Sequence, residues 1–437
     1  MSSTVSSGAS ISTPPPGRTE QAERRRFDML GDPSAGRRPR GRVTGWERRL
    51  VRGLLRAIHD PPIAIVLWDG GEIRICEPQP VARLLVHDRP TLWRLVADPD
   101  LHFGDAYTAG RIEIEGDLLQ FLEAVYRASP TAGPKNRLDR LLAQWRRPRP
   151  NSLTGSRSNI HHHYDIRDDF YRLWLDREMV YTCGYFPTPE TSLEAAQLAK
   201  LDLVCRKLWL RPGETVVEAG CGWGALALHM ARHFGVAVKA YNVSHEQIKF
   251  ARARAKAEGL DGRVEFIEDD YRNVTGRFDA FASVGMLEHV GTEHYGELGR
   301  VIARCLNPAG RGLLHSIGRD TPGRLNPWIE RRIFPGAQTP SLREMLDVLE
   351  PLAFSVLDVE NLRLHYAQTL WHWWQRFDAA ADRVAAMFDD RFVRAWRLYL
   401  AGSMAAFTTG SLQLFQVVFT RHAVNEIPWT RRQVDRQ

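Results

Sequence analysis

The chain has 437 residues, of which 43% are hydrophobic, and this is enough for two or three domains with buried cores. No apolar run reaches the length of about 18 residues that a transmembrane helix needs, and the polar, Arg-rich start is not expected to be a secretory signal. The five Cys are scattered without CxxC spacing, which argues against a disulfide framework or a zinc site and favours a reducing cytosol.

Residues 1–45 are rich in Ser, Pro, Gly and Arg and poor in large apolar side chains, which predicts a disordered basic tail. The net charge of +7 is unevenly distributed: between Arg18 and Arg42, eight Arg minus four acidic residues give a local charge of +4. A second basic cluster extends from Lys135 to Arg149. Two interpretations stay open, namely solvated segments that aid solubility and attraction to anionic lipid headgroups.

Residues 46–128 alternate short strand-like and helical runs, and they predict a small N-terminal α+β domain. Residues 129–150 are rich in Pro and Arg and predict a basic linker. The runs typical of strands are Ile63–Trp68, Glu72–Cys76 and Arg111–Glu115, and the runs typical of helices are Thr91–Ala97 and Leu118–Tyr126.

Residues 151–437 alternate strand and helix patterns, which predicts an α/β fold with a mostly parallel sheet and helices on both faces. The ligand of such a sheet binds in the crevice at the carboxyl ends of the strands. The predicted strands are Thr215–Ala219, Val236–Val243, Arg263–Glu268, Phe278–Val284 and Gly312–Ile317, and the predicted helices are Ala225–Phe234 and His245–Glu258.

A glycine-rich loop, from Gly220 to Gly224, follows the first of these strands and opens a helix. Glycine lets the backbone approach a ligand closely, although a tight turn without a ligand would use it too. The spacing is GxGxG after an acid, Glu218, and the second strand lacks the terminal acid of a dinucleotide site. This favours S-adenosylmethionine, with Glu218 near its methionine amine. Asp269 and Asp270 follow the third strand, where one carboxylate would accept from the adenine amino group unless the pair is a solvated turn.

Seven short motifs then follow one another along the chain. Their residues are HYDIRDDFYRLWLD from His163, YTCGYF from Tyr181, SVGMLEHVG from Ser283, LHSIG from Leu314, NPWIE from Asn326, FPG from Phe334 and HYAQTLW from His365.

This ordered set resembles the cyclopropane-fatty-acyl-phospholipid synthase family, which includes the mycolic acid cyclopropane synthases. The resemblance covers Asn159 to Arg421. The stretch from Gly45 to Tyr126 is more weakly similar to the N-terminal domain of the phospholipid-acting members. Because the shorter mycolic acid enzymes lack that domain, the resemblance favours the acyl chain of an unsaturated phospholipid as the substrate.

The resemblance implies a class I methyltransferase fold and a specific chemistry. In this family a cis double bond attacks the sulfonium methyl of S-adenosylmethionine, the acyl chain becomes a carbocation, and a base removes a proton to close the ring. Water has to be excluded from the cation, and aromatic faces can stabilise it. Family members hold a bicarbonate ion as the base, and the positions that match its site are Cys183, Glu288, His315, Tyr366 and the backbone of Ile317.

The resemblance also implies the cofactor contacts. One position departs from the family pattern, because Asn242 stands where Thr is usual, and an amide can still make a polar contact. His161, His162 and His163 lack a partner cluster at ligand spacing, so no metal site is predicted. The cofactor positions that the resemblance implies are Tyr181, Thr182, Gly220, Gly222, Gly224, Ser244, Gln247 and Asp270.

Single residues have simpler interpretations when they are taken alone. Cys183 would be a small buried side chain, His315 a core histidine, and Glu288 with its neighbour a cap for a helix that begins near Thr292. The stretch from Trp396 to Phe419 fits the lining of an acyl tunnel, and it equally fits a core helix followed by an edge strand.

Several functions remain open at this stage. The same cation could lose a different proton and leave a methyl or methylene branch in place of the ring. A basic RNA methyltransferase and a non-catalytic lipid-binding protein would leave the motif residues or the intact glycine loop unexplained. We expect a cytoplasmic enzyme in peripheral contact with an anionic membrane, at the inner face of the plasma membrane. We expect no nucleic acid partner, and a homodimer is a further expectation.

Overall fold

The computed structural model describes residues 41–75, 79–128 and 168–435. Most of the predicted basic tail, the predicted linker at residues 129–150 and the three adjacent histidines at 161–163 lie outside these residues. Within the described residues, no helix is long and apolar enough to cross a membrane.

The N-terminal part is built around a small sheet with the strand order β2-β1-β3-β4. β1 and β3 are parallel, and the other neighbours are antiparallel. Its first helix begins at Gly45 because Thr44 and Glu47 form a capping box in which each side chain accepts from the other's backbone N–H. The elements are α2 (Gly45–Ala57), β1 (Ile63–Val66), β2 (Glu72–Ile73), β3 (Ala82–Val86), α3 (Arg89–Ala97), α4 (Pro99–Thr108), β4 (Ile112–Gly116) and α5 (Leu118–Ala128).

The larger part is built around a seven-stranded sheet with the order β10-β11-β9-β8-β5-β6-β7. Five neighbouring strands, from β9 to β7, are parallel, and β11 is antiparallel to both of its neighbours. The chain moves from β5 outward to β7 and then returns to β8, so the order reverses beside β5, where such sheets bind ligands. The strands are β5 (Thr215–Ala219), β6 (Ala237–Asn242), β7 (Val264–Glu268), β8 (Phe278–Val284), β9 (Leu306–Gly318), β10 (Phe354–Asn361) and β11 (Gln413–Arg421).

Helices cover both faces of this sheet. Val216 and Val217 are adjacent in β5, and each is completely buried. Val216 belongs to the apolar cluster formed with α9, α10 and α11, whereas Val217 belongs to the cluster formed with α12 and α14. The helices of this part are α8 (Asp168–Tyr171), α9 (Leu193–Lys207), α10 (Ala225–Phe234), α11 (His245–Ala257), α12 (Tyr295–Cys305), α13 (Pro327–Arg332), α14 (Leu342–Leu346), α15 (Arg363–Ala379), α16 (Ala381–Met387), α17 (Asp390–Thr409) and α18 (Arg432–Asp435).

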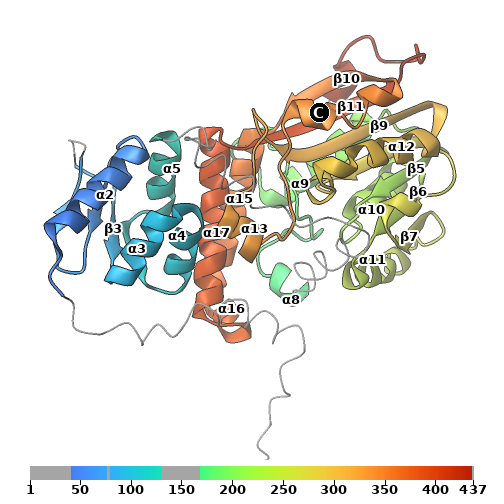
Figure 1. The fold of residues 1–437 in the computed structure, drawn as a ribbon. Helices are drawn as coiled ribbons and strands as arrows, with labels where there is room; N and C mark the ends of the chain where they lie inside the picture. Colours follow the sequence, from blue (N-terminus) through green and yellow to red (C-terminus); the bar gives the residue numbers. More distant parts are fainter. Residues whose placement is uncertain (1–40, 76–78, 129–167, 436–437) are drawn as a thin grey trace, which may run out of the picture.

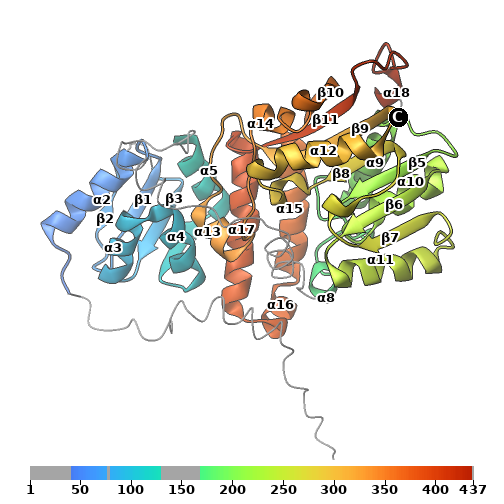
Figure 2. The ribbon, with the colours of Figure 1, turned by 45° about the vertical axis from the view of Figure 1, so that its right-hand side comes forward.

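The two parts meet at α17 and α13. In Figures 1 and 2 the small sheet lies at one end of the molecule and the large sheet at the other, with α17 between them. α17 packs against α4 and α5 on one side and against α15 on the other. Arg394 of α17 donates to the carbonyls of Tyr107 and Ile112, and Arg332 of α13 forms a two-bonded ion pair with Asp105 at 3.0 Å. One apolar core therefore extends from α2 to β11.

The predicted fold class is confirmed: the large part has the mostly parallel sheet of a class I methyltransferase, and a small α/β part precedes it. β3 and β10 are two strands that the sequence analysis does not predict. The interpretation of residues 396–419 as a core helix followed by an edge strand is wrong in its second half, because β11 lies between β9 and β10. β11 is buried on both faces along most of its length, so its apolar run is that of an internal strand.

The contact between Gly104 and Trp328 generates the first prediction. A Cβ at Gly104 of α4 would lie 2.4 Å from the near end of the buried Trp328 ring, so the ring or the helix has to move. We expect Gly104→Ala to destabilise the chain by about 1–3 kcal/mol in urea unfolding, as overpacking typically does.

Gly53 of α2 is the matched control for this change. It is exposed, and a Cβ there would meet nothing within 4 Å. Gly53→Ala should raise stability by about 0.5–1 kcal/mol, because alanine loses less backbone entropy in a helix. Equal effects of the two substitutions would show that α4 does not pack on Trp328 as described.

Candidate active site

The glycine loop joins β5 to α10, and three of its residues have left-handed backbone angles. The φ angles are +83° at Gly220, +54° at Gly222 and +86° at Gly224. A Cβ at Gly220 would lie 2.8 Å from Met286, and one at Gly224 would lie 2.5 Å from Phe266. A Cβ at Gly222 would meet nothing within 4 Å. Packing explains two of the glycines, and the open space above Gly222 is where the backbone can approach a ligand.

A cavity of about 120 Å³ opens beside this loop, at the carboxyl ends of the parallel strands. Of the predicted cofactor positions, Gly224, Ser244 and Asp270 do not line it. The predicted cofactor positions that do line it are Tyr181, Thr182, Glu218, Gly220, Gly222 and Gln247, and they are joined by residues such as Lys200, Trp223, Asn242, Met286 and His289.

Asn242 holds one side of this cavity together. Its Nδ2 donates to Gln247 Oε1 at 2.7 Å and to the carbonyl of Gly222 at 3.4 Å. Ser244 caps α11 instead, because its Oγ accepts from the N–H of Gln247. The residue that departs from the family pattern therefore positions Gln247, while Ser244 acts on the cavity through the helix that it starts.

Asp270 is 2% exposed and is already paired in this structure. Its Oδ1 accepts from the N–H of Arg272, and its Oδ2 lies 3.2 Å from the Arg272 guanidinium. These contacts cap the short 3₁₀ helix Tyr271–Asn273 that follows β7. An adenine amino group would have to share a carboxylate that Arg272 already holds.

Two buried ionisable side chains line the cavity. Glu218 and Lys200 are each 2% exposed, and burial raises the pKa of Glu218 and lowers the pKa of Lys200. Lys200 Nζ donates to Thr182 Oγ1 at 3.0 Å, whereas Glu218 Oε2 has no partner within the described residues. A buried polar atom without a partner is costly, so this oxygen suits a ligand's ammonium group.

Sequence reasoning missed Lys200, although a signal was present. The buried stripe of α9 includes Leu193, Ala196, Val204 and Lys207, and Lys200 lies on it at helical spacing. A lysine on an apolar stripe needs a partner, and this one points to the cofactor cavity.

Glu288 lies in the 3₁₀ turn Leu287–His289, directly after β8. Its Oε1 accepts from the N–H of Ile317 at 2.7 Å, and its Oε2 has no partner within the described residues. Burial raises the pKa of Glu288 to about 7. The interpretation of Glu288 and its neighbour as a helix cap is wrong, because the 3₁₀ helix Thr292–His294 has Gly291 as its N-cap and neither it nor α12 has a side-chain cap.

His315 lies in β9 opposite Gln416 of β11. Gln416 Nε2 lies 3.0 Å from His315 Nδ1, so a hydrogen bond between the two side chains holds the imidazole ring in place and leaves Nε2 on the other side of the ring. That Nε2 has no partner in the described part of the chain. Burial holds the pKa of His315 well below its ordinary value, so the ring is neutral and presents one N–H.

Cys183 and Tyr366 are joined through one carbonyl. Cys183 is fully buried, and its Sγ donates to the carbonyl of Gly184 and faces that of Leu362 at 3.9 Å. The N–H of Tyr366 donates to the same Leu362 carbonyl, and the N–H of Leu362 donates to Leu414 in β11. Leu414 pairs with Ile317 in β9. A series of contacts therefore leads from Cys183 and Tyr366 through Leu362 and β11 to Ile317, whose N–H donates to Glu288.

Aromatic side chains connect this region to α17. The ring of Tyr181 lies 5.2 Å from that of Trp373 and 5.3 Å from that of Trp174. The hydroxyl groups of Tyr181 and Tyr399 are 2.8 Å apart, which links the cofactor cavity directly to α17. Phe407 of α17 contacts the ring of Tyr366 at 4.7 Å. Whether residues 396–419 line an acyl tunnel stays a prediction.

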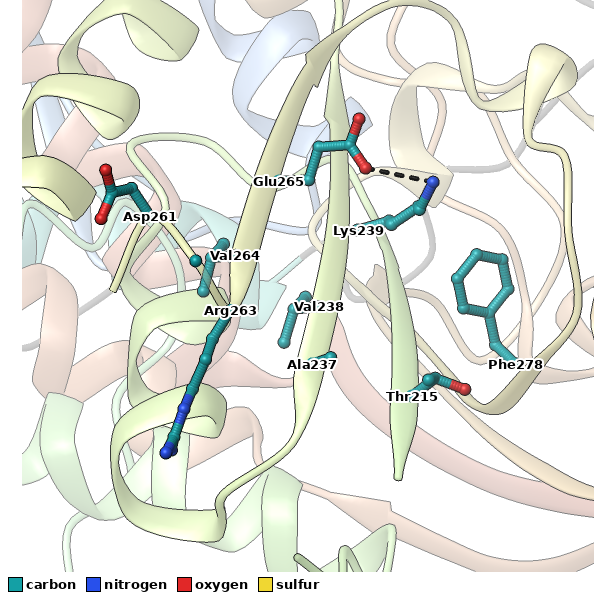
Figure 3. Close-up of a pocket in the computed structure, with 10 residues that line it drawn as sticks. Thr215, Ala237, Val238, Lys239, Asp261, Arg263, Val264, Glu265 and Phe278 are labelled. Atoms are coloured by element: carbon teal, nitrogen blue, oxygen red, sulfur yellow. Dashed lines mark ion pairs between the residues drawn. The ribbon is translucent and has the colours of Figure 1, made fainter. Parts of the chain in front are cut away.

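Figure 3 shows a second hollow, of about 220 Å³, at the opposite end of the same strands. Thr215, Ala237 and Val264, the residues at which β5, β6 and β7 begin, line it. Lys239 and Glu265 form an ion pair beside it at 3.0 Å, and both are largely exposed. Because the glycine loop follows the other end of β5, this hollow is separate from the predicted site.

In the described part of the chain, no group of three His, Cys, Asp or Glu side chains could hold a metal ion. The histidines at 161–163 lie outside that part.

Comparison with known proteins identifies the family. Residues 151–417 match the mycolic acid cyclopropane synthetase family. The chain belongs to this family. Residues 50–135 match a separate domain family of unknown function.

The relatives agree with this assignment. A probable fatty acid methyltransferase from Pseudomonas putida is 33% identical over 400 residues, which cover 87% of this chain and 98% of the relative. The cyclopropane-fatty-acyl-phospholipid synthase of Escherichia coli K12 is 41% identical over 264 residues, which cover 60% of this chain and 68% of the relative.

The solved structure of the mycolic acid cyclopropane synthase CmaA1 complexed with SAH and CTAB has a TM-score of 0.58 and 29% identity, over 61% of this chain and 98% of that one. The protein is therefore an S-adenosylmethionine-dependent methyltransferase of this family, whose named relatives act on fatty acids and fatty acyl lipids.

The open space above Gly222 yields a prediction about the cofactor. Gly222→Ala should leave the chain folded and lower its affinity for S-adenosylhomocysteine by about tenfold or more in calorimetry, because the methyl group would enter the space of the ligand. Gly259 has a φ of +65° and open space around it, away from the cavity, so Gly259→Ala carries similar backbone strain. Equal affinity of the two variants would place the cofactor elsewhere.

The burial of Glu288 yields a prediction about stability. Its pKa is about 7 in the folded chain, against 4.5 for an ordinary glutamate. Between these pH values the folded chain holds a proton that the unfolded chain has lost, so this group lowers stability as the pH rises. The stability of Glu288→Gln relative to the wild type should therefore increase by about 3 kcal/mol between pH 4 and pH 8, as measured by denaturant unfolding. Parallel pH profiles would contradict the raised pKa.

Proposed function

We propose that the enzyme transfers a methylene group from S-adenosylmethionine to the cis double bond of an unsaturated phospholipid acyl chain and forms a cyclopropane ring. The observation that carries the proposal is a pair of buried, unpartnered atoms, Glu288 Oε2 and His315 Nε2, at the strand ends beside the cofactor cavity. Similarity to a cyclopropane-fatty-acyl-phospholipid synthase supports it. So does the small N-terminal part, which the resemblance associates with phospholipid-acting members.

S-adenosylmethionine supplies an electrophilic methyl group when it is bound. The chain would hold it with the loop at Gly220 and Gly222, with Gln247 positioned by Asn242, and with Glu218 at its ammonium group. Lys200 supports this site through Thr182, and its ammonium charge suits the carboxylate of the methionine group. Ser244 and Gly224 contribute by starting α11 and α10 at the right places.

A bicarbonate ion would supply the base for ring closure, and the residues fit such an ion. Glu288 Oε2 can accept from a hydroxyl group, and His315 Nε2 can donate to an oxygen. The N–H of Ile317 already donates to Glu288, so we infer that Ile317 positions the carboxylate. Cys183, whose Sγ faces the Leu362 carbonyl, and Tyr366, whose ring packs on Phe407, would complete the pocket wall.

The aromatic side chains around Tyr181 would protect the reaction from water. Positive charge develops on the acyl chain as the double bond attacks, and water would trap it. The face of Tyr181, which lines the cavity and is held by Trp174 and Trp373, can stabilise such a cation by up to about 2 kcal/mol where it is desolvated. This supports a lipid substrate over a nucleic acid, whose bases would need hydrogen-bonding groups in the pocket.

A second candidate function is methyl or methylene branching of the same acyl chain. The supporting observation is the similarity to a probable fatty acid methyltransferase along 98% of that relative. Both reactions would use the same cofactor site, and in both the methylated cation loses one proton: either the ring closes or a branched alkene forms. A saturated methyl branch would in addition require a hydride donor that reduces the branched product. We also propose peripheral contact with an anionic membrane at the cytoplasmic face, and we keep the homodimer as a prediction.

Product analysis tests the reaction. The enzyme is incubated with vesicles of unsaturated phospholipid, and the acyl chains are analysed by mass spectrometry before and after catalytic hydrogenation. The cyclopropane product has one carbon more than the substrate chain and takes up no hydrogen under mild hydrogenation. The methylene-branched product has the same mass as the cyclopropane product but takes up hydrogen. A saturated methyl branch is heavier than the ring by two hydrogens. Either branched product would replace the ring in the proposal.

Glu288→Gln tests the base site in the same assay. The amide keeps the shape but exchanges an acceptor oxygen for a donor, so turnover should fall by about 10²- to 10⁴-fold while cofactor affinity is retained. Cys183→Ala should be milder, because a thiol bonds weakly and mainly shapes the pocket. Removal of dissolved bicarbonate should slow the wild type and change Glu288→Gln little. Near-normal turnover of Glu288→Gln would place the base elsewhere.

A further inference from the structure

Two tryptophans stack on each other at the surface of the N-terminal part. Trp46 of α2 is 54% exposed and Trp93 of α3 is 42% exposed, with ring centroids 5.1 Å apart. Each is more exposed than is usual for a side chain of this size. A contiguous pair of exposed indoles on a folded surface indicates a place where an apolar or interfacial partner docks.

The helix that carries Trp46 is strongly two-sided. Its inner side buries Val51 and Leu55 in the core. Its outer side presents Arg49, Arg52 and Arg56 at spacings of three and four residues, so they share one face.

Within the described residues, no acidic side chain neutralises these arginines. Elsewhere in this part Arg48 pairs with Asp69 and Arg89 with Glu47. The exposed residues Arg49, Arg52, Arg56 and Arg94 form no ion pair with any described acidic side chain. Arg94 lies next to Trp93 on α3, so uncompensated positive charge is found on both helices that carry the indoles.

We propose that this surface, formed by Trp46, Trp93, Arg49, Arg52, Arg56 and Arg94, docks on an anionic phospholipid bilayer. Indole rings favour the boundary between headgroups and acyl chains, and guanidinium groups bind lipid phosphates. The surface combines both chemistries, whereas a neutral protein partner would leave the arginine charge unmatched. This proposal rests on the proposed function, in which the substrate is a membrane phospholipid. The six residues would hold the enzyme at the bilayer that contains this substrate.

The surface is remote from the chemistry. In both ribbon views α2 and α3 lie at the end of the molecule opposite the large sheet, and α4, α5 and α17 lie between them and the cofactor cavity (Figures 1 and 2). Its residues therefore act as an anchor that concentrates the enzyme at the bilayer. Loss of the anchor should weaken vesicle binding and raise the KM for vesicle substrate, with kcat for detergent-dispersed lipid unchanged.

The experiment uses the full chain with vesicles of phosphatidylglycerol or of phosphatidylcholine. The double variant Trp46→Ala/Trp93→Ala should bind phosphatidylglycerol vesicles about tenfold or more weakly in sedimentation, since binding scales with inserted apolar area. The triple variant Arg49→Gln/Arg52→Gln/Arg56→Gln should lose binding on the order of a hundredfold at low salt and show a weaker salt dependence. Phosphatidylcholine vesicles should bind all forms weakly.

The matched control is Trp371→Ala, a tryptophan of α15 that is 40% exposed and has no part in this surface. Its vesicle binding should equal that of the wild type. Thermal melts establish that each variant is folded. Wild-type binding by the folded Trp46→Ala/Trp93→Ala variant would overturn the proposal. If the surface instead joins two copies, the variant would change the sedimentation coefficient and leave vesicle binding intact, which also overturns it.

The outcomes separate this inference from the proposed reaction. If the wild type binds vesicles through the two tryptophans but modifies no acyl chain, the docking surface stands and the proposed function fails. If the wild type modifies lipid and the tryptophan variants do so equally well on vesicles, the reaction stands and the docking surface fails.

Discussion

One largely buried helix, α17, packs against the small N-terminal part on one side and against the large part on the other. The arrangement of the whole molecule depends on this double contact. On one side it packs on α4 and α5 of the small part, where Arg394 ties it to two backbone carbonyls. On the other side Tyr399 reaches the hydroxyl of Tyr181 at the cofactor cavity. A displacement of this helix would disturb both contacts, so the small part is coupled mechanically to the site of methyl transfer.

The site itself combines three buried ionisable groups with incomplete hydrogen bonding. Glu218, Glu288 and His315 each retain one polar atom without a partner in the described residues, although most buried polar groups in proteins are paired. Unpaired buried groups of this kind cost stability, and a bound ligand can supply the missing partners. Packing around them is tight: Gly220 and Gly224 have no room for a side chain.

Much of this could be predicted from the sequence, because the strong signals are local. The glycine loop, the strand that precedes it and the helix that follows can be recognised from the pattern of residues 215–234. The roles of Asp270 and Ile317 were harder to predict, because they depend on hydrogen bonds that only the folded structure shows. Asp270 accepts from the N–H of Arg272, and the N–H of Ile317 donates to Glu288. The stacking of Trp46 on Trp93 could not be predicted either, because the two residues lie on different helices and their contact leaves no periodic pattern in the sequence.

The position of β11 has a consequence for synthesis of the protein. β11 follows every other strand of its sheet along the chain, yet it inserts between β9 and β10 and supplies Gln416, which fixes the His315 ring. While the ribosome is still making residues 319–412, the edge of β9 is open and His315 has no partner from β11. The nascent chain can therefore form its glycine loop early. It becomes an active enzyme only after β11 has been made and has paired with β9 and β10.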